Sequence, residues 1–391
     1  MMETPTFRYL ILGAGRQGTA AAYDLVRFGQ ARAITLADAD LQTAQQAAAR
    51  VNELVEQPVA QAQAINVLDP AALAAALQAH DAAISAVPYK FNLEITRAAI
   101  AAGCHLADLG GNTEIVRAQY KLHAAAVEAG VSVVPDTGMG PGLVNTLGAY
   151  AMALLDEPQE IYIYDAGLPQ RPEPPWNYAL TFDINGLTNE MDGQAVFLRA
   201  GKVTYVETLS EPEEMFFEPL GRLEADVTSG GVSLAPWNYA GQLQIYENKV
   251  MRYPGHFEWL RAFKTLGLFS EAPFQVGDQT VIPRQVYHAL LAPQISAPGP
   301  VEDIGIFRVI GKGKKAGQAA TVTIELVDYY DPQTGFTAME RLTGWHSAIM
   351  LIFQARGRVE PGVQPVELAV PPAEFLAALE QRGIGHSVVW S

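Results

Sequence analysis

The sequence predicts an α/β protein: an N-terminal Rossmann-type, doubly wound parallel sheet, followed by a second α+β domain with a mixed or antiparallel sheet. Over the first 140 residues, short apolar runs alternate with segments of helical periodicity, which is the pattern of strand–helix units in a parallel sheet. From residue 160 onward, β-branched and aromatic runs separated by turn clusters replace that alternation. A chain of 391 residues is also long enough for two hydrophobic cores.

The elements of the first domain follow from local signals. An apolar run at 9–12 ends in glycine, and Arg16–Phe28 follows as a helix that Gly29 closes, as glycine often does. Asp69 is expected to cap a later helix that has Pro70 in its first turn. Further strands are predicted at 33–37, 82–87, 104–109 and 131–134. Helices are predicted at 70–79, 92–103 and 113–130. Asn92 is expected to open the second of these helices, and Asn112 or Thr113 the third.

The second domain is predicted from six strand-like runs, at 161–164, 178–182, 203–206, 244–253, 304–310 and 321–330. Two helices are expected after them, at 343–354 and 372–382. The chain is therefore divided into a first domain at 1–140, a second at 141–340 and a C-terminal helical segment at 341–391.

Composition excludes several classes of partner. A formal net charge of −16 would repel a phosphate backbone or an anionic membrane surface, so we expect neither nucleic acid nor membrane as a partner. One cysteine, Cys104, cannot form an internal disulfide, and no window has the ~18 apolar residues of a membrane helix. The N-terminus has no basic stretch before an apolar one, so a cytoplasmic protein is expected. No Cys/His spacing indicates a metal site.

The segment Gly13-Ala14-Gly15-Arg16-Gln17-Gly18 has the spacing of a dinucleotide-binding loop. The pattern is weak alone, but here it follows an apolar strand and opens a helix, which is the context that supports it. Gly13 would allow the tight turn, Gly15 the approach of a pyrophosphate, and Gly18 close packing of helix on strand. The amides of Arg16, Gln17 and their neighbours at the helix N-terminus would then bind the phosphates.

Asp38 ends the second predicted strand, twenty residues after Gly18, where a carboxylate can accept hydrogen bonds from a ribose 2′-hydroxyl and would repel a 2′-phosphate. The expected cofactor is therefore NAD rather than NADP. Ligands bind beyond the carboxyl ends of parallel strands, so residues that follow the third and fourth strands are also candidates: Asn66 and Val67 for the adenine, and Ala86, Val87 and Pro88 for the nicotinamide ribose.

Polar residues at later strand ends are candidates for chemistry. Asp108 is either a group on the cofactor side of the site or a turn aspartate, and Asp136 is favoured as functional because Asn145 lies on the helix after it. In the second domain, Arg252 and His256 end a strand together. A guanidinium and an imidazole there could bind a carboxylate and move a proton, although an isolated histidine is more often structural.

Several longer motifs resemble those of the saccharopine dehydrogenase-like family, and within it the lysine 6-dehydrogenases. They are Asp136-Thr137-Gly138-Met139-Gly140-Pro141-Gly142-Leu143-Val144-Asn145, Gly167-Leu168-Pro169, Arg199-Ala200-Gly201-Lys202-Val203, Arg252-Tyr253-Pro254-Gly255-His256 and Leu342-Thr343-Gly344-Trp345. The resemblance covers nearly the whole chain. It implies NAD-dependent oxidation of an amino acid's side-chain amine, with the last helices packed on the nucleotide domain and a homo-oligomer, either a dimer or a tetramer.

The resemblance also implies roles for single residues. His256 or Asp136 would take the proton from the amine, and the amino-acid substrate would be held by Arg252, with Arg171 as a second carboxylate candidate, and by Thr137 and Asn145. Two alternatives remain: a saccharopine or carboxynorspermidine dehydrogenase-type reductive condensation, and an NAD-binding sensor without turnover.

Overall fold

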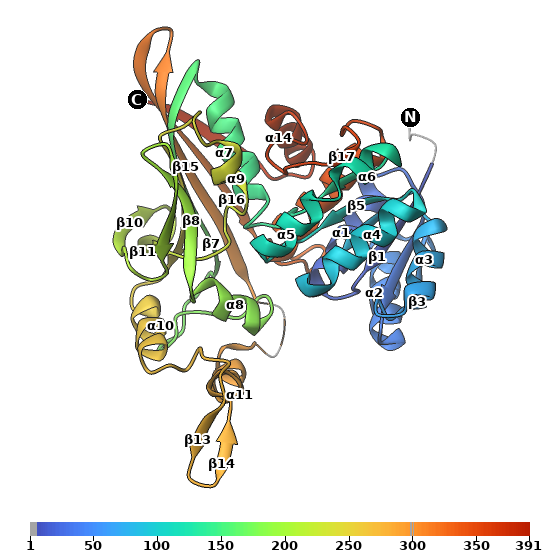
Figure 1. Ribbon diagram of the computed structural model, residues 1–391, viewed down its shortest axis with the longest axis horizontal. Coiled ribbons are helices and arrows are strands. Elements are labelled where there is room, and N and C mark those ends of the chain that lie inside the picture. The colour runs from blue at the N-terminus through green and yellow to red at the C-terminus, as the bar shows by residue number, and fades with distance from the viewer. Residues whose placement is uncertain (1–5, 298, 300) are drawn as a thin grey trace. The chain divides into compact units, whose positions relative to one another are not determined.

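The computed structural model describes residues 6–297, 299 and 301–391. They form two compact units, drawn in Figure 1. The first runs to Leu154 and also takes in Val232–Asn238 and Glu340–His386, while the second comprises Leu155–Gly231, Tyr239–Met339 and Ser387–Ser391. Each unit has its own sheet and its own buried core.

The first unit is built on a seven-stranded sheet in the order β17-β6-β5-β4-β1-β2-β3. Its strands pair in parallel throughout, which confirms the predicted doubly wound sheet. The strands are β1 (Phe7–Leu12), β2 (Ala31–Asp38), β3 (Ala60–Ala64), β4 (Ala82–Ser85), β5 (His105–Asp108), β6 (Ser132–Val134) and β17 (Gly362–Val363). The strand order reverses between β1 and β4, the point at which open α/β sheets bind ligands.

Helices cover both faces of this sheet (Figure 1). Residues of β1 alternate between two cores: Tyr9 and Ile11 pack with α1, α2 and α13, whereas Leu10 and Leu12 pack with α3, α4 and α6. The helices are α1 (Arg16–Phe28), α2 (Leu41–Val55), α3 (Pro70–Gln78), α4 (Asn92–Ala102), α5 (Thr113–Tyr120), α6 (His123–Glu128), α7 (Leu143–Leu154), α13 (His346–Ala355) and α14 (Pro372–Glu380).

Four details of the first unit differ from the sequence prediction. Helix α2 lies in a stretch for which no helix was predicted, and the single helix expected at 113–130 is two helices, α5 and α6. The C-terminal segment, expected to be helical, also supplies the edge strand β17. Asn92 does not cap α4, because its Oδ1 atom accepts a hydrogen bond from the buried Ser85 hydroxyl at 2.8 Å. Asp69 and Asn112 do cap α3 and α5, as predicted.

The second unit is built on a nine-stranded mixed sheet, in which β7 runs parallel to β12 and antiparallel to β15. Its strands are β7 (Glu157–Pro169), β8 (Gln194–Arg199), β9 (Lys202–Glu207), β10 (Glu213–Phe217), β11 (Gly221–Val227), β12 (Ile245–Arg252), β15 (Asp303–Lys315), β16 (Gln318–Tyr329) and β18 (His386–Trp390). The strand predicted at 178–182 is wrong: this stretch is irregular, and Tyr178 packs into a core with helices instead.

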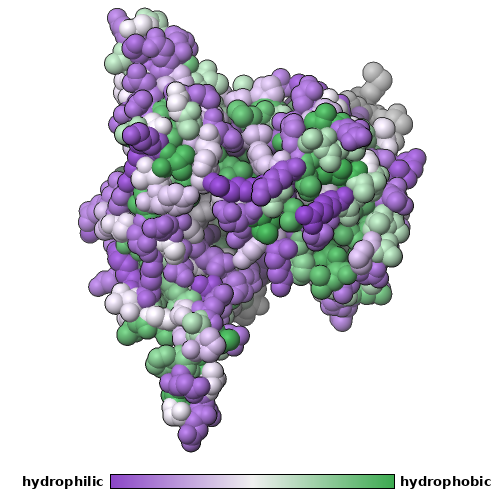
Figure 2. All heavy atoms as spheres, in the orientation of Figure 1, coloured by the Kyte–Doolittle hydropathy of each residue, from purple (hydrophilic) through white to green (hydrophobic). Residues whose placement is uncertain are grey.

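Helices α8 (Ile184–Glu190), α10 (His256–Thr265) and α11 (Pro283–Ile295) supply a second core of this unit, and β13 (Phe274–Val276) and β14 (Gln279–Val281) form a separate hairpin. Figure 2 shows hydrophilic and hydrophobic residues mixed on the face drawn, with hydrophobic ones at the surface of the first unit and also near α11. On α11, Val286 and Leu290 are exposed. Among the described residues, none of the helices combines the length and the apolar character needed to span a bilayer.

The remaining elements are a 3-10 turn, η1 (Tyr89–Phe91), the short helices α9 (Ala235–Asn238) and α12 (Ala338–Glu340), and a π-helical turn, η2 (Arg341–Trp345). A Cβ atom on Gly344 would lie 2.7 Å from the carbonyl oxygen of Gln17, so glycine is needed for this turn to pack on α1. Arg382, after α14, donates to both carboxylate oxygens of the buried Asp24 of α1, at 2.6 and 2.7 Å. These contacts hold the C-terminal segment on the first unit.

Candidate active site

The glycine loop between β1 and α1 is shaped by contacts that exclude side chains. Gly13 has φ +99°, and a Cβ atom there would lie 2.5 Å from the carbonyl oxygen of Ala86. A Cβ atom on Gly18 would lie 2.0 Å from the carbonyl oxygen of Gly13. At Gly15, by contrast, no described atom lies within 4 Å of the Cβ position. The loop is therefore closed at its two ends and open in its middle, where a pyrophosphate would approach.

The N-terminus of α1 adjoins this opening. Gly15 is its N-cap residue, and no side chain of the described residues caps this end. The first amides of a helix lack partners within the helix and carry partial positive charge. Arg16 is exposed and Gln17 half-buried at the same end. These features fit a bound diphosphate.

Asp38 ends β2 beside the loop. Its Oδ2 atom accepts a hydrogen bond from the Ala14 amide at 3.0 Å, and its Oδ1 atom accepts one from the Asp40 amide at 3.0 Å. Each oxygen keeps lone-pair capacity for a further donor. The carboxylate is thus held in place next to the loop and can still receive ribose hydroxyls.

The other candidates for the cofactor lie at neighbouring strand ends. The Ala86 amide donates to the carbonyl oxygen of Leu12 at 2.7 Å, which keeps the segment after β4 next to the loop. Val87 is half-buried, and Pro88 is exposed. After β3, Asn66 is exposed and Val67 is half-buried.

Three buried carboxyl groups lie beyond the same edge of the sheet. Asp108 is fully buried, and its carboxylate accepts hydrogen bonds from the Gly110 amide at 2.8 Å, the Asp136 amide at 3.3 Å and the Gln119 side chain at 2.7 Å. The Asp108 carboxylate is thus occupied by three donors within the protein and stabilises the turn after β5. Glu367 is also buried and accepts from the Asn238 amide group at 2.8 Å.

Asp136 differs from its two neighbours because part of its carboxyl group lacks a partner. The residue follows β6 with φ +63°, it is 4% exposed, and its Oδ1 atom has no hydrogen-bond partner among the described residues. Burial, reinforced by the negative charge of Asp108, raises the pKa of Asp136 to about 8. A carboxyl group that titrates near neutral pH is suited to accept and release a proton.

Thr137 and Asn145 are fully buried and use their polar atoms within the first unit. The Thr137 hydroxyl lies 2.8 Å from both the carbonyl oxygen of Asp108 and the Ser347 hydroxyl. The Asn145 side chain accepts from the Gly142 amide at 3.2 Å and donates to the carbonyl oxygen of Val232 at 3.1 Å. They therefore support the turn that carries Asp136, and their expected substrate contacts stay a prediction.

A second polar site lies in the second unit. The strand register places Asp165 of β7 beside Val250 of β12. Side chains alternate between the two faces along a strand, so Asp165 lies on the same face of the sheet as Asn248 and Arg252. The Asn248 side chain donates to Asp165 Oδ1 at 2.7 Å. Around these strands stand three more residues, and the six together are called the Arg252 cluster: Asp165, Tyr178, Glu190, Asn248, Arg252 and His256.

The guanidinium of Arg252 is the centre of this cluster. It lies 5.2 Å from the centroid of the Tyr178 ring, and its Nη2 atom lies 3.6 Å from Glu190 Oε2. Burial raises the pKa of Glu190 to about 7 and that of Asp165 to about 6, and the charge of Arg252 opposes both shifts. One cation is therefore surrounded by two carboxyl groups.

His256 begins α10 after the turn at Gly255, which has φ +92°. Its ring centroid lies 4.7 Å from that of Tyr178, and its Nδ1 atom lies 3.0 Å from the carbonyl oxygen of Trp176. This contact assigns the hydrogen to Nδ1 and leaves Nε2 as an acceptor. Burial, together with the charge of Arg252, lowers the pKa of His256 to about 3, so the ring is neutral at physiological pH.

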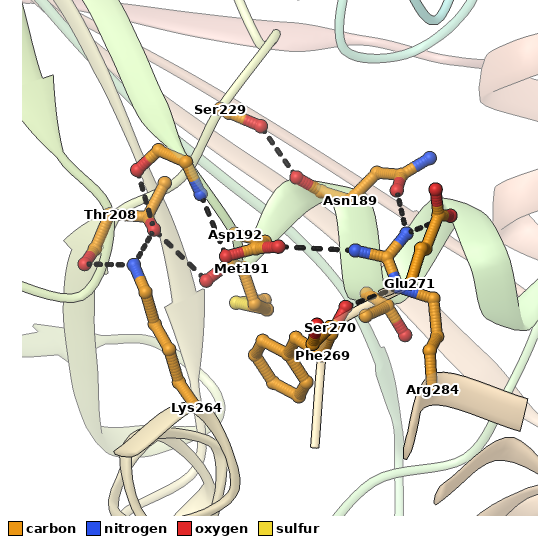
Figure 3. Close-up of polar contacts among 12 residues, drawn as sticks. Asn189, Met191, Asp192, Thr208, Ser229, Lys264, Phe269, Ser270, Glu271 and Arg284 are labelled. Atoms are coloured by element: carbon orange, nitrogen blue, oxygen red, sulfur yellow. Dashed lines mark hydrogen bonds and ion pairs between the residues drawn. The ribbon is translucent and has the colours of Figure 1, made fainter. Parts of the chain in front are cut away.

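Figure 3 shows the polar contacts that hold the C-terminal end of α8, the helix that carries Glu190. Ser229 donates through its hydroxyl to the carbonyl oxygen of Asn189 at 2.6 Å, and through its amide to that of Glu190 at 2.8 Å. Arg284 donates to Asn189 Oδ1 at 2.9 Å and to Asp192 Oδ2 at 3.1 Å. The backbone of Glu190 is thereby fixed from both sides.

The structure brings together only some of the residues singled out in the sequence. Arg252 and His256 share a cluster in the second unit, and Asp136 and Asp108 share one in the first. Arg171 is exposed in the segment after β7. Sequence reasoning missed Glu190, Tyr178, Asn248 and Glu367. It also passed over Asp165, although an aspartate within the apolar run of β7 was a visible signal.

The parallel sheet, the glycine loop and the carboxylate at the end of β2 define a nucleotide-binding domain of the kind found in dehydrogenases. Residues 9–134 match the saccharopine dehydrogenase NADP binding domain, and residues 138–384 match the saccharopine dehydrogenase C-terminal domain. The chain belongs to the saccharopine dehydrogenase family of oxidoreductases. The family resemblance of the sequence motifs is thereby confirmed at that level.

Individual relatives are distant. The chain is 27% identical over 287 residues to a carboxynorspermidine synthase of Vibrio cholerae, a match that covers 71% of this chain and 67% of that protein. It is 26% identical over 227 residues to an L-glutamate-forming, NADP(+) saccharopine dehydrogenase of Pyricularia oryzae, of which the match covers 48%. The chain thus spans two thirds of the first relative and about half of the second.

A solved saccharopine dehydrogenase of Saccharomyces cerevisiae has the same fold. It superposes with a TM-score of 0.78 at 18% identity, and the match covers 99% of this chain and 100% of that one. The likeness extends over both units of the fold.

Proposed function

We propose that this protein is an NAD-dependent oxidoreductase that deaminates the side-chain amine of an amino acid, in the manner of a lysine 6-dehydrogenase. The observation that carries the proposal is Asp136. It is a buried carboxyl group with a pKa near 8, it has an oxygen without a partner among the described residues, and it follows a strand of the sheet whose glycine loop fits a dinucleotide. Removing hydride from an amine requires such a proton acceptor nearby.

The reaction needs a proton acceptor from the protein. Asp136 takes a proton from the nitrogen of the substrate's side-chain amine. NAD, when bound, accepts the hydride from the carbon that carries this amine. Water then adds to the resulting iminium ion and ammonia leaves. Overall, the protonated amine, NAD⁺ and water yield an aldehyde, ammonium, NADH and a proton.

Asp136 replaces His256 as the preferred proton acceptor. A general base works best when its pKa lies near the operating pH. Burial and the charge of Arg252 hold the pKa of His256 near 3, which makes its ring a weak base. Asp136, with a pKa near 8, meets the requirement. His256 then acts as a neutral hydrogen-bonding group.

The preference for NAD rests on the residues after β2. The segment Asp38-Ala39-Asp40 carries two carboxylates and no cation, and the Asp38 carboxylate is held beside the loop by the Ala14 amide. A 2′-phosphate there would meet negative charge. The names of some relatives specify NADP(+), so NADP is the alternative cofactor.

A second candidate is reductive condensation, in which an amine and a carbonyl compound form an imine that the reduced cofactor then reduces. The similarity to a carboxynorspermidine synthase over 71% of this chain favours it. Both reactions act at a C–N bond, so they differ in direction and in the second substrate. A sensor that binds NAD without turnover is the third candidate.

The deciding experiment measures NADH and ammonia together when purified protein is given NAD and L-lysine. Equal amounts of both products are expected. Oxidation of NADH or NADPH on adding an amine and an aldehyde, without ammonia release in the first assay, would establish condensation instead. Cofactor binding without turnover in either assay would leave the sensor. Asp136→Asn protein serves as the inactive control.

Cofactor choice is tested by changing the end of β2. Asp38→Ala combined with Ala39→Arg is expected to weaken NAD binding by ~10–100-fold, because a hydrogen bond to a charged group contributes about 1.5–3 kcal/mol, and to let NADP bind. Fluorescence titration with each cofactor measures both effects. Asp40→Asn, which can still cap α2, should keep the preference for NAD. Unchanged NAD affinity in the double variant would remove Asp38 from the ribose site.

A further inference from the structure

Unpartnered polar atoms are concentrated in the Arg252 cluster. Across the described ranges of the chain, Glu190 Oε2, Asn248 Oδ1 and His256 Nε2 are buried without a hydrogen-bond partner, and so are Arg252 Nε and the Tyr178 hydroxyl. A buried polar group left unpaired costs about 1–3 kcal/mol. Such groups are rare in native proteins, and several in one place require an explanation.

The unpartnered atoms have complementary chemistry. Glu190 Oε2 and Asn248 Oδ1 are acceptors, and His256 Nε2 is one as well, because Nδ1 of that ring carries the hydrogen. An ammonium group has three N–H donors and no acceptor. Arg252 Nε is a donor, and a carboxylate is its natural partner. The cluster therefore offers three acceptors to a cation and one guanidinium to an anion, which is the arrangement that a zwitterion requires.

We propose that the Arg252 cluster binds the α-amino and α-carboxyl groups of a free α-amino acid, with the α-ammonium received by Glu190, Asn248 and His256 and the carboxylate by Arg252. The substrate class is then an α-amino acid held by its head group, and the reacting amine is on its side chain. This inference rests on the proposed function, since it names the class of compound on which that reaction acts. It adds the ammonium subsite and the residues that form it.

Charge and position support this assignment. Glu190 keeps 28% of its side chain exposed, although its Oε2 atom is buried. Its distance of 3.6 Å from Arg252 is too long for a direct hydrogen bond, which leaves both groups able to bind a ligand. Asp165 adds a second negative charge and orients the Asn248 amide at 2.7 Å.

The contacts at the end of α8 hold the main chain that carries Glu190. The carbonyl oxygens of Asn189 and Glu190 are both held by Ser229, and the side chains of Asn189 and Asp192 are held by Arg284 (Figure 3). A site whose groups are held in place before binding loses less entropy when the ligand arrives.

The test compares ligands that differ by one group. The NADH-loaded full-length protein is titrated by calorimetry with L-lysine and 6-aminohexanoate, and with L-ornithine and 5-aminopentanoate, since the second member of each pair lacks the α-amino group. Wild-type protein should bind the α-amino acid of one pair at least ~10-fold more tightly than its partner, the effect of one hydrogen bond to a charged group. In Glu190→Gln protein, the ratio of the two dissociation constants within that pair should fall to within ~3-fold of unity. Glu190→Asp protein should regain part of the wild-type ratio.

Glu271→Gln is the matched control, because Glu271 also lies near α8 and pairs with Arg284 at 2.9 Å but is outside the cluster. It should leave the ratio at the wild-type value, and melting temperatures should show that all variants are folded. An equal ratio in wild-type and Glu190→Gln protein overturns the proposal. So does a wild-type protein that binds neither amino acid, or binds each as weakly as its partner, since the cluster would then hold only water.

The readout separates this inference from the proposed function. Binding requires no turnover, so an amino acid that binds with the expected dependence on Glu190 but yields neither NADH nor ammonia would overturn the function and leave the head-group site. Turnover of L-lysine with no dependence of binding on Glu190 would overturn the head-group site and leave the proposed function.

Discussion

Asp136→Asn protein is expected to bind NAD and substrate with near wild-type affinity and to lose kcat by ~10²–10⁴-fold, the range that a general base contributes. The substitution keeps the shape of the side chain and removes its ability to accept a proton. Asparagine also tolerates the left-handed backbone that Asp136 adopts at φ +63°, so the turn should persist. Steady-state kinetics and cofactor titration measure the two quantities separately.

The pH dependence gives a second readout of the same residue. Because burial and Asp108 raise the pKa of Asp136 to about 8, the proton-accepting form increases as pH rises, and wild-type kcat/KM should climb through pH 7–8. The ascending limb should vanish in Asp136→Asn protein. Glu128→Gln, which removes an exposed carboxyl group of the same unit, should leave the profile unchanged. A wild-type rate in the Asp136→Asn variant would exclude Asp136 as the base.

Stability should move with pH in a direction fixed by the sign of the shift. A carboxyl group whose pKa is higher in the folded state stabilises the fold below its ordinary pKa, and this contribution is lost as pH rises through the folded value. For Asp136 the loss runs from about pH 4 to about pH 8. Asp136→Asn protein should therefore melt at a higher temperature than wild type at pH 9, and the difference should shrink toward pH 4.

The first sheet was predictable because its signals are local. Strands β1, β2, β5 and β6 end at or just before glycine, aspartate or proline, and helices such as α1 and α3 show their caps in the sequence. Helix α2 was missed although Asp40 caps it through the Gln42 amide, because its mixed run of alanines and glutamines shows only a narrow apolar stripe. The run at 178–182 has strand-like composition, yet tertiary packing of Tyr178 against His256 and Arg252 overrides that tendency.

The candidate site was predictable only where chemistry follows a motif. The glycine loop and Asp38 have fixed spacing, and Asp136, Arg252 and His256 stand at strand ends beside turn residues. Glu190 and Glu367 have no such marker: one ends a short helix and the other lies in an irregular segment. Their significance comes from burial beside groups distant in sequence, Arg252 for the first and Asp136 for the second. That information exists only once the chain is folded.

Substitutions in the glycine loop are also expected to have a large effect, on cofactor affinity. Two of them, Gly15→Val and Gly18→Ala, should differ in their effect on stability. Gly15→Val is expected to weaken NADH binding by ~10-fold or more, because its side chain would enter the open space where the pyrophosphate approaches, at a cost of at least one hydrogen bond to a charged group. The melting temperature should stay within ~2 °C of wild type, since no described atom lies within 4 Å of the Cβ position and the backbone there is extended, so little free energy of unfolding is lost.

Gly18→Ala is the matched comparison within the same motif. Its Cβ atom would lie 2.0 Å from the carbonyl oxygen of Gly13, so the loop must shift, and overpacking of this kind costs about 1–3 kcal/mol. This variant should lose both melting temperature and cofactor affinity, whereas Gly15→Val should lose affinity alone. The contrast matters because a general loosening of the loop would affect both variants alike. Retained NADH affinity in folded Gly15→Val protein would show that the nucleotide does not lie against this loop, and the dehydrogenase proposal would fail with it.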